Sequence, residues 1–223
     1  MDEGLSRRTA LAVLAAGTLA PRGVSAAEVC PLTPQAVEGP FYLDPRLVRA
    51  DIREDRQGVP LSLSLRVVAT PSCGALAGAR VDVWHADAQG RYSGYPGQGD
   101  RGASTVGQTF LRGTQFTDRE GVATFRTIYP GWYPGRTTHV HVKVILDART
   151  ALTGQIYFPD AANAAVQTRS PAYGGRPARG RISNDRDGLL REDDPQRRGL
   201  AQVTEEGEGY AAILTLGVRR AGA

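Results

Sequence analysis

Short runs of alternating apolar and polar residues, separated by proline and glycine, constrain the fold of this chain more than any other feature. Residues 61–67 (LSLSLRV) and 79–84 (ARVDVW) alternate residue by residue, which is the period of a half-buried β-strand. Further candidate strands cover residues 109–112, 122–128, 138–146, 154–158 and 211–218. About seven short strands at this spacing are typical of a β-sandwich. The sequence therefore predicts an all-β, single-domain β-sandwich.

The segments outside these runs are expected to be loops, with one short helix. Prolines recur between residues 28 and 60 and exclude a long helix there, so this part is predicted to be an irregular N-terminal arm on the core. Asp160 is expected to cap a short helix over residues 161–167. Residues 169–199 are polar, with proline and glycine, and are expected to form long loops. No internal repeat or second domain is indicated.

The first 26 residues have the layout of a signal peptide. Arg7 and Arg8 precede an uncharged apolar run over residues 10–20, which is too short to span a bilayer, and small residues follow at 24–26. The paired arginines favour the twin-arginine type. We therefore expect a signal peptide at 1–26, a folded domain at 27–223, and an exported protein in the periplasm or outside the cell, without a stable membrane anchor. The alternative is a frayed N-terminal helix.

The charge pattern gives no indication of a nucleic-acid partner. The net charge is +4 and the sequence pI about 9.3, but the positive charge is almost all arginine and is spread along the chain. Lys143 is the only lysine, and no basic run is longer than two residues. A dispersed, solvated surface explains this pattern, so we predict no nucleic-acid binding.

Two cysteines, Cys30 and Cys73, follow the predicted signal peptide. Outside the cytoplasm an isolated pair of this kind forms a disulfide in most proteins, which here would tie the arm to the core. Metal ligation is the alternative, but the chain lacks the CxxC spacing of such sites. We predict a Cys30–Cys73 disulfide.

The clearest candidate for chemistry is the run 138–144 (THVHVKV). Side chains alternate between the two faces of a strand, so His139 and His141 point to the same side and the valines between them to the other. Two imidazoles one pleat apart can bind one metal ion. The alternative for such a pair is a structural or solvated role.

Tyrosines near the same end of the predicted sheet change the balance between these alternatives. Tyr133 and Arg136 lie in the turn before His139, and Tyr92 lies in the loop after the strand 79–84. A phenol has a pKa of about 10, so only a strong Lewis acid keeps it ionised at neutral pH. Zinc sites use His, Cys and carboxylates, and many Fe(II) oxygenases use two His and one carboxylate. Two phenolates with two imidazoles suit Fe(III).

Five segments in order carry a family resemblance. They are 37–42 (VEGPFY), 83–93 (VWHADAQGRYS), 110–115 (FLRGTQ), 127–133 (TIYPGWY) and 136–141 (RTTHVH). Together they resemble the intradiol dioxygenase family, which includes the catechol and protocatechuate enzymes. The resemblance covers roughly residues 30 to 160 and, more loosely, the C-terminal strand, and the run Tyr-Pro-x-Arg-x-x-His-x-His is its most specific part.

The resemblance implies a role for each matching residue. Tyr92 matches the tyrosine that stays on iron, and Tyr133 the tyrosine that leaves when substrate binds. His139 and His141 match the two imidazole ligands, and the implied cofactor is Fe(III). Arg136 matches the arginine beside the reacting ring. A glutamine that lines the site corresponds to Gln155, whereas His85 matches no ligand and is expected to cap or pack the end of its strand.

The implied activity is intradiol cleavage of a small catechol-type aromatic diol by O2, which gives a cis,cis-muconate-type product. Tyr133, once freed, would serve as base for a substrate proton, and Arg136 would stabilise negative charge that develops on the ring. Trp132 and Gly135 differ from the protocatechuate pattern, so the substrate stays open, as does the oligomeric state. The alternative from another class is a non-catalytic, exported, transthyretin-like β-sandwich that binds a ligand or partner.

Overall fold

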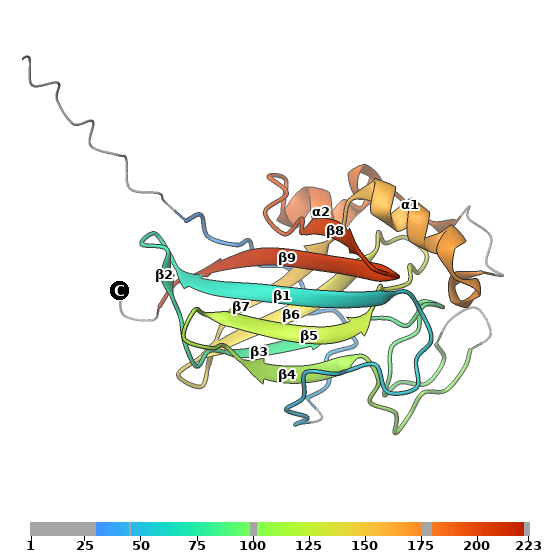
Figure 1. Ribbon diagram of the computed structural model, residues 1–223, viewed down its shortest axis with the longest axis horizontal. Helices are drawn as coiled ribbons and strands as arrows, with labels where there is room; N and C mark the ends of the chain where they lie inside the picture. The colour runs from blue at the N-terminus through green and yellow to red at the C-terminus, as the bar shows by residue number, and fades with distance from the viewer. Residues whose placement is uncertain (1–29, 45, 99–101, 175–179, 221–223) are drawn as a thin grey trace, which may run out of the picture.

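The alternating segments form two sheets that pack face to face (Figure 1). The computed structural model describes residues 30–44, 46–98, 102–174 and 180–220. The predicted signal peptide lies outside these residues. Among the described helices, none combines the length and the apolar character that crossing a membrane requires.

The first sheet has five strands. It is built from β1 (Pro60–Ala69), β2 (Gly74–Ala75), β5 (Val122–Ile128), β8 (Gln202–Glu206) and β9 (Gly209–Val218). β1 pairs on one side with β2 and β5 and on the other with β9, and β8 pairs with β9. The β1–β9 pairing is parallel, whereas the other pairings are antiparallel.

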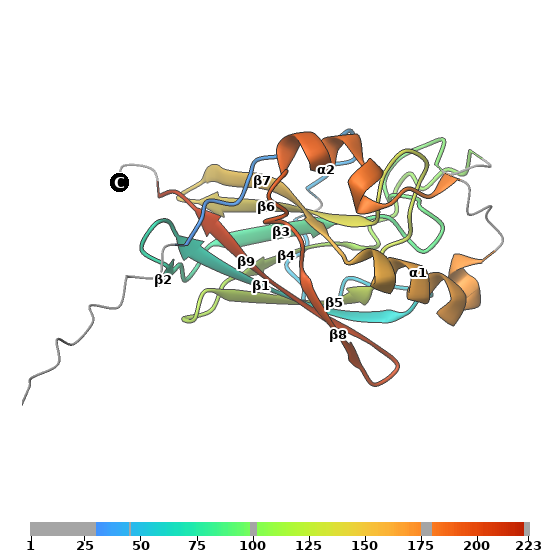
Figure 2. The same cartoon turned by 90° about the horizontal axis from the view of Figure 1, so that it is seen from above.

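The second sheet is entirely antiparallel and has the order β4–β3–β6–β7. Its strands are β3 (Arg80–Trp84), β4 (Arg112–Phe116), β6 (His139–Leu146) and β7 (Arg149–Tyr157). Figure 2 shows this sheet packed on the first, with the short helix α2 (Gly188–Asp193) beyond its outer side. The structure thus confirms the all-β sandwich.

The space between the sheets holds the apolar face of each alternating strand. Leu63 and Leu65 of β1 and Val140 and Val142 of β6 are at most 1% exposed. Complete burial of each such side chain stabilises the fold by roughly 1.5–3 kcal/mol. Because the valines of β6 face this core, the histidines between them face outward.

Cross-strand register fixes what surrounds those histidines. His141 pairs with Trp84 of β3 on one side and with Gln155 of β7 on the other. His139 pairs with Tyr157 of β7. Residues directly opposite one another in a sheet share a face, so these five side chains lie together on the outer face of the second sheet.

The strand expected at 109–112 is placed wrongly. The structure begins β4 at Arg112, and Leu111 has a φ of 56°, which extended backbone does not adopt. Instead, the Leu111 amide donates to the Ile52 carbonyl of the arm, 2.7 Å away. The local prediction failed here because a tertiary contact sets the backbone conformation of Leu111. β8 was missed because its side chains are mostly exposed.

The C-terminal part has more helix than predicted. Helix α1 spans Asp160–Arg169, so Asp160 is its first residue and not its cap; the N-cap is Pro159, without a side-chain hydrogen bond. The Asp160 carboxylate accepts the Asn184 amide instead, at 3.1 Å. The expected long loops at 169–199 contain α2 and the short 3-10 helices η1 (Pro171–Tyr173) and η3 (Asn184–Arg186).

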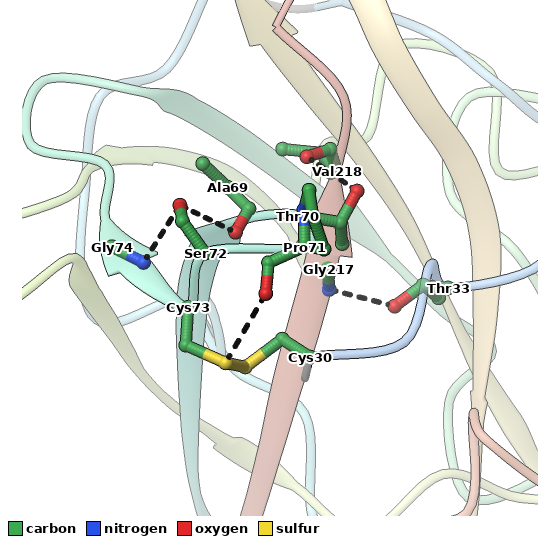
Figure 3. The surroundings of a disulfide bond; sticks show 10 residues. All are labelled: Cys30, Thr33, Ala69, Thr70, Pro71, Ser72, Cys73, Gly74, Gly217 and Val218. Carbon is green, nitrogen blue, oxygen red and sulfur yellow. Dashed lines mark hydrogen bonds between the residues drawn. A yellow bond between two sulfur atoms is a disulfide. The ribbon is translucent and has the colours of Figure 1, made fainter. Parts of the chain in front are cut away.

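The N-terminal arm is irregular, as predicted, and is fastened at its start. Cys30 forms a disulfide with Cys73, which lies in the turn between β1 and β2 (Figure 3). Nearby, Thr33 and Gly217 exchange two hydrogen bonds of 2.9 Å, which align the arm with β9. The Ala36 amide then donates to the Thr153 carbonyl of β7, and from there the arm continues over the outer face of the second sheet.

Replacing both cysteines with serine is expected to lower the free energy of unfolding by about 4 kcal/mol, because the bridge closes a long loop in the unfolded chain. Cys30 and Cys73 are 43 residues apart. Denaturant titration measures the loss, and reduced wild-type protein is the matched control. Titration of the denatured, unreduced wild type should detect no free thiol, whereas two free thiols would contradict the bridge.

Candidate metal centre

The terminal atoms of two tyrosines and two histidines gather at one point of the outer sheet face. The Tyr133 hydroxyl lies 3.0 Å from Nε2 of His139, the Tyr92 hydroxyl 3.3 Å from it, and Nε2 of His141 3.2 Å from it. Tyr92, His139 and His141 are each at most 3% exposed. The structure therefore brings together all four side chains that the sequence singled out as ligands.

Different elements deliver these four side chains. His139 and His141 stand on β6. Tyr92 comes from the long connection between β3 and β4, and Tyr133 comes directly before the turn at Pro134 and Gly135. Gly135 has a φ of 82°, a conformation that glycine adopts without strain. Only the histidines are therefore held by regular structure.

A backbone hydrogen bond orients the imidazole of His139. Its Nδ1–H donates to the Thr137 carbonyl at 2.7 Å, so Nε2 carries the lone pair and faces the two tyrosine hydroxyls. Burial lowers the pKa of His139 to about 3, and the Arg136 guanidinium acts in the same direction. The ring is therefore neutral, as a metal ligand requires.

Stacking on Trp84 helps to orient the ring of His141, whose Nε2 faces Nε2 of His139. The His141 ring lies on Trp84 with centroids 4.9 Å apart and planes 8° from parallel. Among the described residues, its buried Nδ1 has no hydrogen-bond partner. Burial and then His139 lower the pKa of His141 well below its usual value, so this ring is also neutral. From the arm, Gly39 lies close to the same ring.

The two tyrosines differ in their surroundings. Tyr92 is 1% exposed and its ring stacks on Phe41 of the arm, with centroids 4.6 Å apart. Tyr133 is only partly buried. Burial raises the pKa of both phenols: Tyr133 further raises that of Tyr92, while Arg136 opposes the shift at each. Without a cation both phenols are therefore protonated.

The arrangement fits a small, highly charged cation. The two Nε2 atoms lie 3.2 Å apart, and two phenols that burial keeps neutral complete the group. Donors bound at 2.0–2.1 Å to one tetrahedral ion would lie about 3.3 Å apart. Among the described residues, no three His, Cys, Asp or Glu side chains are placed to share a metal ion. Any metal at this point therefore depends on the phenol oxygens.

Arg136 and Gln155 lie beside this group and are joined to each other. Nη2 of Arg136 donates to Oε1 of Gln155, which also accepts the Tyr157 hydroxyl at 2.9 Å. The amide of Gln155 donates to the Val37 carbonyl of the arm at 3.2 Å. On its other edge, Nε of Arg136 donates to Asp187 at 2.9 Å. The structure thus places both predicted catalytic residues next to the candidate ligands.

A second buried arginine, Arg112, was not predicted. It is 1% exposed and donates to the Ser93 hydroxyl at 2.8 Å and to the Ser93 and Phe41 carbonyls at 2.7 Å each. It therefore clamps the arm to the residue that follows Tyr92. Burial lowers its pKa to about 10, so the side chain remains a cation.

His85 packs at the end of its strand, as expected, away from the group of ligands. Its Nε2 lies 2.7 Å from the Thr127 hydroxyl of β5 and its Nδ1 2.8 Å from the Ala86 carbonyl. Burial lowers its pKa to about 4. Sequence reasoning missed Asp187, which stands in no recognisable local pattern. It also missed two residues for which a signal existed: Tyr157 lies in the strand expected at 154–158, two residues after Gln155, and Arg112 lies in the segment 110–115.

Comparison with known protein families gives one match. A family model described as Dioxygenase matches residues 34–169. Among curated proteins, catechol 1,2-dioxygenase 1 of Acinetobacter lwoffii is 30% identical over 146 residues, covering 55% of this chain and 45% of that protein. Chlorocatechol 1,2-dioxygenase of a Pseudomonas strain is 31% identical over 144 residues, covering 55% and 54%. The matched part spans about half the length of these curated relatives.

Two solved structures cover far more of the chain. An intradiol ring-cleavage dioxygenase from Tetranychus urticae is 32% identical, with a TM-score of 0.76, covering 85% of this chain and 95% of that chain. The dioxygenase domain of a dioxygenase and carbohydrate-binding fusion protein from Streptomyces sp. SirexAA-E is also 32% identical, with a TM-score of 0.63, covering 86% and 100%. The similarity to these structures extends over both sheets.

Proposed function

Because this chain belongs to the intradiol ring-cleavage dioxygenase family, we propose that it uses Fe(III) and O2 to open a catechol-type aromatic ring. The bond cleaved would lie between the two hydroxyl-bearing carbons, and the product would be a cis,cis-muconate-type dicarboxylate. Tyr92, Tyr133, His139 and His141 would hold the iron. The curated relatives with this kind of name act on catechol or chlorocatechol, and this chain is proposed to act on a diol of that class.

One observation carries the proposal: the phenol oxygens of Tyr92 and Tyr133 and Nε2 of His141 all lie within 3.3 Å of Nε2 of His139. Two neutral imidazoles and two phenols suit Fe(III) better than zinc or Fe(II), since two phenolates offset much of its charge. Bound Fe(III) would act there as Lewis acid and as template for the diol and O2.

The protein's own groups would divide the remaining work. Tyr133 is the more exposed of the two phenols and precedes a turn outside the strands, so it would be the ligand that moves away and accepts a substrate proton. Arg136 would stabilise negative charge that develops on the ring. Gln155, which holds Arg136 on one edge and the arm on the other, would keep both in place.

The first expectation is that the purified protein contains iron and is coloured by phenolate-to-Fe(III) charge transfer. His139→Ala and His141→Ala should lose both iron and colour. The third histidine of the chain is the control: His85→Gln should retain both, because His85 bonds Thr127 and lies outside the candidate ligands. Metal analysis and visible absorption measure the outcome.

Activity is then measured with catechol, protocatechuate and hydroxyquinol, with identification of the products and of O2 uptake. A ring-opened product of the muconate type from any of the three is expected. A colourless protein that takes up zinc and no iron on reconstitution would overturn the assignment, and it would favour a binding module of the same fold.

Replacing the two tyrosines should have unequal effects. Tyr133→Phe is expected to keep most of the iron and to lower kcat by about 10²–10⁴-fold, the usual size of a general-base contribution. Tyr92→Phe should weaken iron binding instead, because that buried phenol is the ligand that would stay on the metal. Iron content and single-turnover rates of both variants are compared. Equal loss of iron and rate in both would contradict the two roles, and full activity of Tyr133→Phe would remove its role as base.

We also propose that the protein is exported after folding, by the twin-arginine route. The support is the Arg7–Arg8 pair before an apolar run and a disulfide in the folded domain. A metal site whose ligands come from separate segments scarcely exists in an unfolded chain. Replacing both arginines with lysine should leave precursor inside the cell, as cell fractionation would detect. Undiminished export would point to the general secretion route.

A further inference from the structure

We propose that Asp187 is a positioning residue for the reaction: its buried carboxylate holds the guanidinium of Arg136 in the plane that faces the reacting ring. The inference rests on the proposed function, because it assigns Arg136 a task at the diol. Asp187 lies beyond residues 34–169, the part that the family model matches.

The contacts of Asp187 leave its carboxylate little freedom. Oδ2 accepts Nε of Arg136 at 2.9 Å and the Thr137 amide at 2.8 Å. Oδ1 accepts the Leu190 amide at 3.0 Å and so caps helix α2. One carboxylate thus joins the turn that carries Arg136, the residue after it and a helix of the C-terminal segment.

Arg136 is held on two edges as a result. Nε bonds Asp187 and Nη2 bonds Gln155 of β7, which fixes the plane of the guanidinium between two separate elements. The side chain of Asp187 is fully buried and that of Arg136 is 13% exposed. A carboxylate taken out of water is stable only when it is paired and hydrogen-bonded, so the negative charge at this point depends on Arg136 and the two amides.

The negative charge of Asp187 is not needed to cap helix α2. A serine or an asparagine also caps a helix well, and the Thr137 amide needs only a neutral acceptor. Only Arg136 calls for an anion. Burial tends to raise the pKa of Asp187, but the Leu190 and Thr137 amides and the Arg136 guanidinium outweigh it, so the carboxyl is ionised at neutral pH.

Two substitutions separate the charge from the cap. Asp187→Asn keeps the shape of the side chain, and Asp187→Ser keeps a capping oxygen, while both remove the carboxylate. In the iron-loaded protein each should lower kcat by up to about a hundredfold, the effect of a displaced catalytic group. KM should stay within about threefold and iron content should not change, because an interaction made only in the transition state appears in kcat.

Asp194 provides the matched control. It lies in the same segment, is 4% exposed, and accepts two backbone amides, those of Arg198 at 2.9 Å and Gly199 at 2.6 Å. The side-chain hydrogen bonds and the ion pair described for Arg136 go to Asp187 and Gln155 and not to Asp194. Asp194→Asn and the Asp187 variants should all lower the melting temperature, because each removes a buried acceptor, but the kcat of folded Asp194→Asn should stay within about twofold of wild type.

A double-mutant cycle gives the decisive measurement. If Asp187 acts through Arg136, Asp187→Asn should have little further effect on kcat once Arg136→Gln is present, whereas Asp194→Asn should be additive with Arg136→Gln. The same cycle in the unfolding of the iron-free protein provides a readout that does not depend on activity, and it should show coupling between positions 187 and 136 only.

The outcomes are distinct. A wild type that takes up iron but opens none of the diols would overturn the proposed function and this inference with it. Two results with an active wild type would overturn this inference alone and leave the proposed function standing. The first is that Asp187→Asn and Asp187→Ser lower stability but not kcat. The second is that Asp187→Asn lowers kcat by the same factor with and without Arg136→Gln. A loss of iron in both Asp187 variants would also overturn it, since Asp187 would then act on the ligands and not on Arg136.

Discussion

The register of β6 between β3 and β7 is the constraint on which the whole site depends. With His141 opposite Trp84 and Gln155, every second residue of β6 faces the outer surface and the valines between face the core. A slip of one residue would turn both imidazoles into an apolar interior and the valines outward. The hydrophobic core therefore determines where the histidines point, and the same packing that stabilises the sandwich orients half of the candidate donor set.

Because this outer face is buried, each of its polar groups also needs a hydrogen-bond partner. Irregular segments supply those partners: the arm, through the Val37 and Phe41 carbonyls, and the C-terminal segment, through Asp187. Backbone without regular structure can be held at a fixed position when its own hydrogen bonds are satisfied by neighbouring elements. That is why Arg112, with three hydrogen bonds to neutral oxygens, lies buried between the arm and the loop that carries Tyr92.

Local sequence patterns predicted those parts of the fold and site that depend on local rules. Alternation located most strands and put His139 and His141 on one face, and family-like segments singled out Tyr92 and Tyr133. Apart from the exposed strand β8, which carries no alternating pattern, the failures depended on contacts distant in sequence. Leu111 has a positive φ, and its amide bonds the arm. No sequence pattern near residue 187 indicates its hydrogen bond to residue 136. The ligand roles themselves stay predictions, because they concern a metal ion and not the fold.

The two buried arginines give the site a graded electrostatic environment. Burial is the main influence on each phenol and raises its pKa, and the cations oppose it: Arg136 at both tyrosines, and Arg112 at Tyr92. Arg112 is fixed by neutral oxygens, so its charge is not shared with any carboxylate among its hydrogen-bond partners. Arg136, in contrast, is paired with Asp187. The deeply buried Tyr92 thus has an unshared cation near it, whereas the more exposed Tyr133 has one whose charge is partly balanced. The pKa of Tyr92 is nevertheless raised well above its usual value, so the two arginines only partly offset its burial, and a bound metal cation would have to supply what is missing to keep that phenol ionised.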